Sequence, residues 1–386
     1  MKELDFARKL GTRLFLTTVF LMTLIASAVS PVAAASGNDK DDDGARSTVY
    51  TMTNAAAGNE ILAYDQAADG SLTFRAAYAT DGAGTGMGLG SQGSVILSQN
   101  GNWLFAVNAG SNEISVFRIG KNDLHQTDVV DSGGVKPISL TISGRVLYVL
   151  NAGDTSTAGN ITGFQLRDNG TLEPLADTTQ PLSSDAPGAT IGPAQVSFDN
   201  RGDMLVVTEK ITSLIDTYEV HDGIADSPMT SPSAGQTPFG FAFDQRNHPI
   251  VSEAFGGAPN ASAVSSYELN DGAVEVISPS VPTTQTAACW VAISKNGNYA
   301  YAANAGSGSV SSYQISKNGE ITLLEAQAGV NGGSAIDLAV SNSGKYLFSL
   351  AGGVSTISVF RIRGDGSLEL QSDVSVPAGS VGLAAS

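Results

Sequence analysis

The sequence predicts a seven-bladed β-propeller, an all-β fold in which four-stranded antiparallel blades surround a central channel. Three observations predict it: a unit of about 50 residues recurs seven times, its segments alternate apolar and polar residues, and the two chain ends hold complementary parts of one unit. Neither a β-sandwich nor two separate β domains would explain seven units in phase. We name the strands of a blade A to D, from the innermost to the outermost.

Each unit contains one strand with a central aromatic residue, as in EISVFRI (113–119), SVSSYQI (309–315) and TISVFRI (356–362). Alternation with a period of two, carried by β-branched and aromatic residues, is typical of a strand. The aromatic residues of the seven units are Tyr64, Phe117, Phe164, Tyr218, Tyr267, Tyr313 and Phe360. Most of these strands run into Asp-Gly or Asn-Gly, which tolerate the positive φ of a tight hairpin turn. We assign this strand to position C.

Two more apolar strands precede the aromatic one in each unit. The nearer one, strand B, ends in turn on Asn54, Asn108, Asn151, Glu209, Glu253, Asn304 and Ala351. The other, strand A, includes the segments 138–143 and 336–341, and a last copy, VGLAAS (381–386), ends the chain. Because the chain starts midway through a unit, we expect 381–386 to pair with the N-terminal strands and close the ring.

The N-terminus is typical of an export signal. Basic residues precede the apolar run 14–29, which is too short for a good membrane span, and Ala33-Ala34-Ala35 fits a signal-peptidase site. We therefore predict a signal peptide over 1–35, an acidic flexible lead-in over 36–47 and the propeller over 48–386. The mature protein is expected in the periplasm or outside the cell, with no attachment to the membrane.

Composition excludes several classes of function. The chain has 37 acidic and 20 basic residues, a net charge of -17, which repels the phosphates of nucleic acid and anionic membrane surfaces. A single cysteine, Cys289, allows no internal disulfide and no cysteine-based metal site. The three histidines fall on turns at the face opposite the expected site, so we predict no metal and no cofactor. We expect a monomer.

The candidate site lies at the channel mouth on the face that carries the B–C and D–A loops. Glu209, Lys210 and Glu253 are the predicted catalytic residues, because two carboxylates and a lysine in a partly enclosed channel can shift each other's pKa and act as acid and base. The predicted ligand-binding residues are Gln195, Asn108, Asn151, Asn304, Trp290, Asp337 and Lys136. A second interpretation stays open, in which the asparagines cap strand-ending turns and the tryptophan packs between blades.

Repeated phrases such as LYVLNAG (147–153) and YAYAANAG (299–306) resemble the lactonase-type seven-bladed propellers, a family that includes 6-phosphogluconolactonases and carboxymuconate cyclases. The resemblance covers almost the whole mature chain. It implies a lactonase-like hydrolase or a cycloisomerase-like enzyme, in which Glu209 is the general base on water. In the stretch 191–218, Gln195 and Glu209 fit the family's pattern.

The same stretch also departs from that pattern. Gly192 and Ala194 stand where the family has histidines, and Ser213 and Leu214 replace an Asp-Arg pair. Without the arginine a bidentate anion contact is lost, so we expect a small neutral lactone or sugar-derived ligand. The alternative is a non-catalytic propeller that binds a ligand or a protein partner on the same face, similar to the YVTN-type surface propellers. The sequence leaves open whether the protein is an enzyme.

Overall fold

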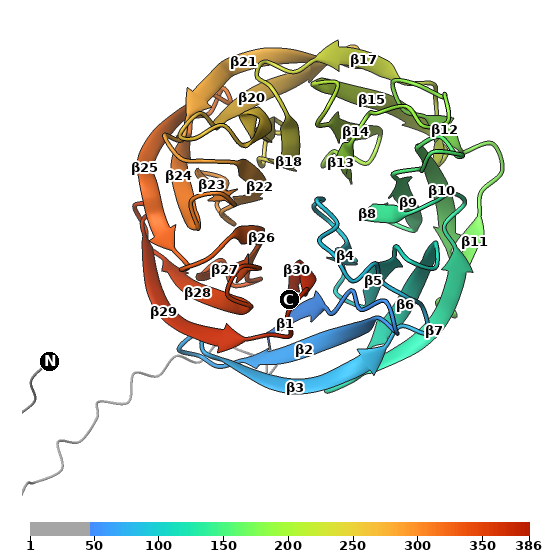
Figure 1. Cartoon of the computed structure of the whole chain (residues 1–386), viewed down its shortest axis with the longest axis horizontal. Helices are drawn as coiled ribbons and strands as arrows, with labels where there is room; N and C mark the ends of the chain where they lie inside the picture. The colour runs from blue at the N-terminus through green and yellow to red at the C-terminus, as the bar shows by residue number, and fades with distance from the viewer. Residues whose placement is uncertain (1–46) are drawn as a thin grey trace, which may run out of the picture. The chain divides into compact units, whose positions relative to one another are not determined.

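The computed structural model describes residues 47–386, so the predicted signal peptide and all but the last residue of the predicted lead-in lie outside the described part. Seven antiparallel sheets surround a central channel (Figure 1), and the only helical element in this part is a 3₁₀ turn, η1 (Phe255–Gly257). The predicted seven-bladed propeller is confirmed. No helix among the described residues is long and apolar enough to cross a membrane.

The first four blades are given from the innermost strand outwards. Blade 1 consists of β30 (Val381–Ala385), β1 (Thr48–Met52), β2 (Glu60–Gln66) and β3 (Leu72–Ala79). Blade 2 consists of β4 (Val95–Leu97), β5 (Trp103–Asn108), β6 (Glu113–Ile119) and β7 (Leu124–Asp131). Blade 3 consists of β8 (Pro137–Ser143), β9 (Val146–Asn151), β10 (Asn160–Leu166) and an outer edge split into β11 (Leu172–Pro174) and β12 (Gln180–Pro181). Blade 4 consists of β13 (Pro193–Phe198), β14 (Met204–Glu209), β15 (Leu214–His221) and a similarly split edge of β16 (Ile224–Ala225) and β17 (Met229–Pro232).

The last three blades are regular. Blade 5 consists of β18 (Pro238–Phe243), β19 (Pro249–Glu253), β20 (Ala263–Asn270) and β21 (Ala273–Pro282). Blade 6 consists of β22 (Ala288–Ile293), β23 (Tyr299–Asn304), β24 (Ser309–Ile315) and β25 (Ile321–Val330). Blade 7 consists of β26 (Ala335–Val340), β27 (Tyr346–Ala351), β28 (Thr356–Ile362) and β29 (Leu368–Ser375).

The repeated aromatic residue of strand C fills the space between neighbouring blades. All seven copies are at most 2% exposed. A buried tyrosine needs a partner for its hydroxyl, and three copies find it on the preceding blade. The hydroxyls of Tyr218 and Tyr313 donate to the carbonyls of Pro181 (2.9 Å) and Val281 (3.1 Å), and that of Tyr267 accepts from a loop amide at 2.9 Å. The repeat therefore fills the core, and its tyrosines in blades 4 to 6 also form hydrogen bonds to the preceding blade or its loop.

The C-terminal strand closes the ring, as the sequence predicts. β30 pairs antiparallel with β1, with Tyr50 opposite Ala384 and Met52 opposite Val381. The hydroxyl of Thr51 donates to the carbonyl of Val381 at 3.1 Å. In Figure 1 the red end of the chain lies beside the blue first strand. The two ends thus form one sheet, and β1 keeps no free inner edge.

Candidate functional site

The asparagines at the ends of the B strands lie inside their own blades. Asn108, Asn151 and Asn304 are fully buried. The side-chain Nδ2 of Asn108 donates to the hydroxyl of Ser115 at 2.8 Å, and that of Asn304 donates to Ser311 at 2.9 Å. Each contact ties the end of strand B to strand C. This geometry supports the turn-capping interpretation, and the ligand-binding role of the three asparagines stays a prediction.

Glu253 occupies the equivalent place in blade 5. Its carboxylate accepts hydrogen bonds from the Gly235 amide (2.8 Å) and from the hydroxyls of Ser265 (2.5 Å) and Ser280 (2.7 Å). Burial raises the pKa of Glu253 above its ordinary value. Three donors from its own blade and loop surround this carboxylate, so it holds the corner of blade 5 together.

Glu209 occupies the same place in blade 4, but a second carboxyl group faces it. Its carboxylate accepts from the amide (2.9 Å) and hydroxyl (2.6 Å) of Ser183 and from the hydroxyl of Thr212 (2.5 Å). On β15, Asp216 stands where blades 2, 5 and 6 have serine. Asp216 is fully buried: its Oδ1 accepts from Thr230 at 2.7 Å, and its Oδ2 has no donor.

The second carboxyl group of blade 4, Asp216, has a strongly raised pKa. Burial first, and the nearby Glu209 carboxyl group second, raise the pKa of Asp216 to about 8. With this pKa, and with no hydrogen-bond partner at its Oδ2, Asp216 is largely protonated near neutral pH. Sequence reasoning missed this pair, although an aspartate in the serine position of the repeat was a visible signal.

These contacts bear on the catalytic roles predicted for the glutamates. Glu209 and Glu253 belong to different blades, both are fully buried, and each carboxylate accepts three hydrogen bonds from local donors. A general base needs an open side that faces its substrate. The predicted role of the two glutamates is therefore not favoured by their position.

Lys210, directly after β14, has a different environment. Its Nζ donates to the carbonyls of Gly90 (2.5 Å) and Pro193 (3.0 Å) and lies 4.7 Å from the centre of the Phe239 ring. Burial, with the positive charge of Lys136 adding to it, lowers the pKa of Lys210 to about 8. A lysine with this pKa is partly neutral near pH 7.5, and a neutral amine has a lone pair that can accept a proton.

Aromatic and sulfur groups extend the environment of Lys210. The Phe239 and Trp290 rings lie 4.9 Å apart between centroids, and the Trp290 Nε1 donates to the Ser91 carbonyl at 2.9 Å. Trp290 is only 6% exposed, which agrees with the packing role left open by the sequence. Burial raises the pKa of the neighbouring Cys289 thiol to about 12, so it remains protonated. Phe239 and Cys289 were not predicted as site residues.

The connection from β3 to β4 crosses the channel and reaches the far inner strands. In Figure 1 the loop beside β4 extends toward the centre of the ring. The Gln92 side chain donates to the Val291 carbonyl on β22 at 2.8 Å and accepts from the Val291 amide at 3.1 Å. A Cβ added at Gly240 would lie 2.1 Å from the Gln92 Oε1. Glycine in β18 therefore makes room for this side chain, and the segment 88–93 acts as a plug.

A cavity of about 320 Å³ lies between β4, β8, β13, β26 and β30. Its polar lining includes Gln92, Gln195 and Asp337. Gln195 bridges to the next inner strand, with its Nε2 donating to the Phe241 carbonyl at 3.0 Å. Asp337 is 2% exposed, and burial raises its pKa well above the usual range. Two of the predicted ligand-binding residues thus line one cavity, where Asp337 is a neutral acid.

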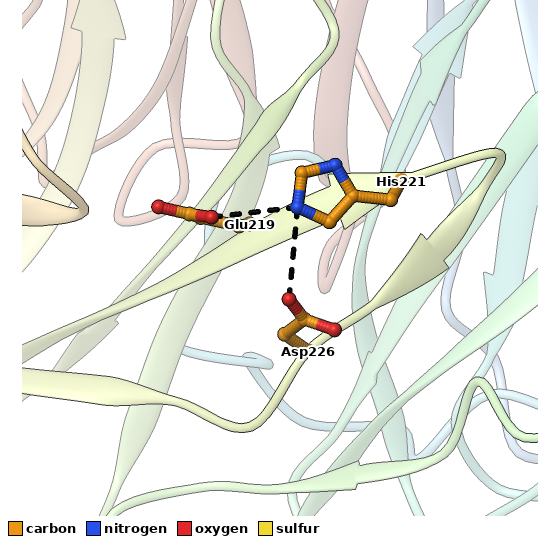
Figure 2. A group of neighbouring side chains, drawn as sticks. All are labelled: Glu219, His221 and Asp226. Atoms are coloured by element: carbon orange, nitrogen blue, oxygen red, sulfur yellow. Dashed lines mark ion pairs between the residues drawn. The ribbon is translucent and has the colours of Figure 1, made fainter.

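One group of described side chains has the composition of a metal site. Glu219, His221 and Asp226 meet at the hairpin between β15 and β16 (Figure 2). The His221 Nε2 lies 3.4 Å from the Glu219 carboxylate and 3.7 Å from that of Asp226. All three residues are exposed, and they lie at the opposite end of β15 from Lys210. Exposed groups of this kind are ordinary ion pairs when the histidine is protonated.

Comparison with known proteins identifies the family. The model of the family "Lactonase, 7-bladed beta-propeller" matches residues 43–180 and 253–385. The chain belongs to this lactonase family. No curated protein matches the sequence.

Solved structures of similar fold include proteins described as lactonases. A putative 6-phosphogluconolactonase from Bacteroides uniformis is 17% identical with a TM-score of 0.70, covering 88% of this chain and 99% of that one. One from Bacteroides fragilis is 19% identical with a TM-score of 0.69, covering 90% and 100%. The periplasmic gluconolactonase PpgL of Pseudomonas aeruginosa is 16% identical with a TM-score of 0.67, covering 88% and 98%. At these identities the likeness shows the fold.

The matched ranges of this lactonase-family chain leave out residues 181–252. This part contains Gln195, Glu209, Lys210 and Phe239, in the stretch where the sequence departs from the family's histidine and arginine pattern. The family match therefore does not extend to Lys210 or Phe239.

Proposed function

We propose that this lactonase-family propeller opens a small lactone ring at the channel mouth beside the plug, with Lys210 as the general base. The observation that carries the proposal is the position of the Lys210 Nζ, half-buried against Phe239 and held by two backbone carbonyls. Two carbonyl acceptors match the two N–H groups of a neutral amine and leave its lone pair for a water molecule.

The reaction then follows from the chemistry of the amine. Lys210 takes a proton from water as the water oxygen bonds to the lactone carbonyl carbon. The ring C–O bond breaks, and the leaving oxygen takes the proton back from Lys210, so the product is a hydroxy acid. The exposed ammonium of Lys136 is close enough to lower the pKa of Lys210 and would attract the new carboxylate.

Replacing Lys210 tests this proposal. Lys210→Met removes the amine and keeps an apolar stem against Phe239, whereas Lys210→Arg keeps the charge but cannot lose its proton. We expect both variants to lose about 10²- to 10⁴-fold in kcat/KM on neutral five- and six-membered lactones. The wild-type rate should rise with pH around 8, because only the neutral amine acts as a base.

The matched control is Lys295→Met. Lys295 lies in an A–B turn on the opposite face, where its Nζ donates to the Asn342 carbonyl of the neighbouring A–B turn. If wild type hydrolyses the lactones and both Lys210 variants do so at the same rate, Lys210 is not part of the mechanism. If wild type binds these lactones without hydrolysing them, the non-catalytic alternative is correct. That alternative is supported by the plug across the channel and by the engaged carboxylates of Glu209 and Glu253.

Export is part of the same proposal. The basic residues and apolar run at the N-terminus support it, as does the Ala33-Ala34-Ala35 motif. We expect the protein in the periplasm or the medium of an expressing bacterium, with Ser36 as its first residue by N-terminal sequencing. A cytoplasmic protein that still begins at Met1 would contradict this expectation.

A further inference from the structure

Three arginines surround one cavity on the face opposite Lys210, between blades 2 and 3. Arg118 is the second-last residue of β6, Arg145 lies in the turn before β9, and Arg167 follows β10. The cavity has a volume of about 300 Å³. Its complete lining is Asn100, Asn102, Trp103, Arg118, Ile119, Arg145, Arg167 and Asp168. The lining thus holds three arginines and one acidic residue, in a protein whose net charge is -17.

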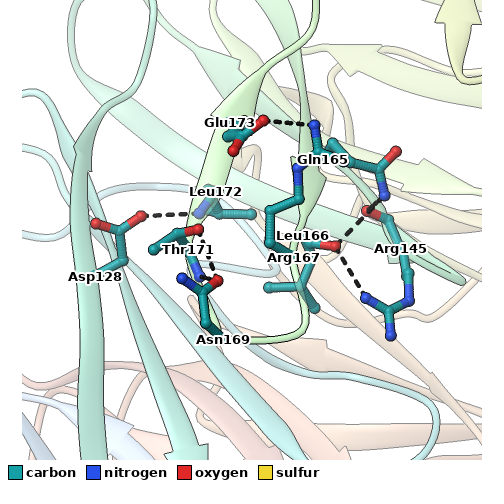
Figure 3. Close-up of polar contacts among 9 residues, drawn as sticks. All are labelled: Asp128, Arg145, Gln165, Leu166, Arg167, Asn169, Thr171, Leu172 and Glu173. Carbon is teal, nitrogen blue, oxygen red and sulfur yellow. Dashed lines mark hydrogen bonds and ion pairs between the residues drawn. The ribbon is translucent and has the colours of Figure 1, made fainter.

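Contacts between the two blades hold the cavity in shape. Gly170 has a φ of +87°, and a Cβ there would lie 2.5 Å from the Trp103 ring, so the turn of blade 3 fits against this ring only with glycine. The Thr127 hydroxyl donates to the Gly170 carbonyl at 3.0 Å, and the Leu172 amide donates to Asp128 at 2.8 Å. Figure 3 shows Asp128 of blade 2 beside this turn of blade 3.

The three arginines differ in the partners of their guanidinium groups. Arg145 pairs with Asp168 and Arg167 with Glu173, but all four side chains are at least half exposed. Exposed pairs of this kind contribute about 0–1 kcal/mol, so an anion can displace them. Arg118 packs over the Trp103 ring at 5.9 Å and has no carboxylate partner among the described residues. Arg118 is therefore the guanidinium most available to a ligand.

We propose that this cavity binds the oxyanion of a small acidic ligand, a carboxylate or phosphate group on a molecule of about the size of a sugar. A guanidinium presents paired N–H donors that match the oxygens of either group. The Asn100 Oδ1 already accepts from Ser98 (2.7 Å) and Asn102 (3.1 Å), which leaves the Asn100 Nδ2 to donate. The volume is at the lower end of small-molecule sites. This site is separate from Lys210 and does not depend on the lactonase proposal.

Titration calorimetry with inorganic phosphate, gluconate and glucose tests the proposal at low and high salt. We expect the two anions to bind wild type in about the millimolar range, more weakly as salt rises, and glucose not to bind. Arg118→Gln should weaken binding about tenfold. The double variant Arg145→Gln/Arg167→Gln should weaken it at least as much. Arg361→Gln is the matched control, because TISVFRI (356–362) places Arg361 at the same position of blade 7.

Each outcome decides the question. Binding of either anion that falls in the Arg118 variant but not in the Arg361 variant supports the site, and the stronger anion identifies the preferred group. Equal loss in both variants would show general charge attraction, and absence of binding to folded wild type would show that there is no site. Unfolding midpoints of the variants, measured in parallel, identify any loss that comes from misfolding. Loss of lactone hydrolysis in the Lys210 variants would leave these results unchanged.

Discussion

Asp216→Asn is expected to abolish most of the fall in stability that Asp216 causes in the wild-type protein between pH 4 and pH 8. In the unfolded chain this carboxyl ionises near pH 3.8, whereas in the folded protein its pKa is about 8. Between these values the folded state binds one proton more than the unfolded state, so the free energy of unfolding falls as pH rises. The slope is about 1.4 kcal/mol per pH unit, or about 4 kcal/mol from pH 5 to pH 8.

Asparagine removes this linkage and keeps the shape of the side chain. Its amide oxygen can accept from Thr230 as the carboxyl group does, and it has no proton to lose. Urea unfolding at pH 5 and pH 8 measures the effect as the difference between wild type and variant, so that other groups cancel. Asp271→Asn, at an exposed turn between β20 and β21, is the control and should follow wild type at both pH values. Parallel pH curves for wild type and Asp216→Asn would contradict the raised pKa of Asp216.

The fold was predictable because its signal is repeated. Seven copies of the strand C aromatic residue and the lone last strand at 381–386 all indicate a closed ring of blades. The prediction of the fold therefore does not depend on any single ambiguous segment. A propeller also fixes which loops share a face, so the sequence predicts that Lys210 lies on the face of the B–C loops. The alternation of apolar and polar residues and the complementary chain ends can both be read directly from the sequence.

The site was less predictable, because the side-chain direction at the end of strand B depends on tertiary contacts. Glutamate in place of asparagine at 209 and 253 indicated chemistry, but both side chains point into the protein. There their carboxylates accept hydrogen bonds from backbone amides and from serine and threonine hydroxyls. The plug could not be placed either. The connection 80–94 is visibly longer than the connection 132–136, but nothing in its composition shows that Gln92 reaches Val291 across the channel.

Removing residues 380–386 is expected to prevent stable folding. The truncation deletes β30, so β1 loses its inner partner and the buried side chains of Val381 and Leu383 leave the core. An open ring also leaves a sheet edge that promotes aggregation. We expect the truncated protein to be insoluble or to unfold at far lower urea concentration than wild type. The expected decrease in the free energy of unfolding is at least about 5 kcal/mol, which is as large as the whole stability of many domains.

A graded variant separates closure from the mere loss of chain. Leu383→Ala keeps β30 and should cost about 2–4 kcal/mol, because Leu383 is 7% exposed and leaves a cavity between the first and last blades. Leu370→Ala on β29 is the matched control: that side chain is 50% exposed, and its loss should change stability by less than about 0.5 kcal/mol. A truncated protein with the unfolding midpoint of wild type would show that the ring does not depend on its C-terminal strand. The graded series therefore tests whether the pairing of the two chain ends, β1 with β30, stabilises the whole ring.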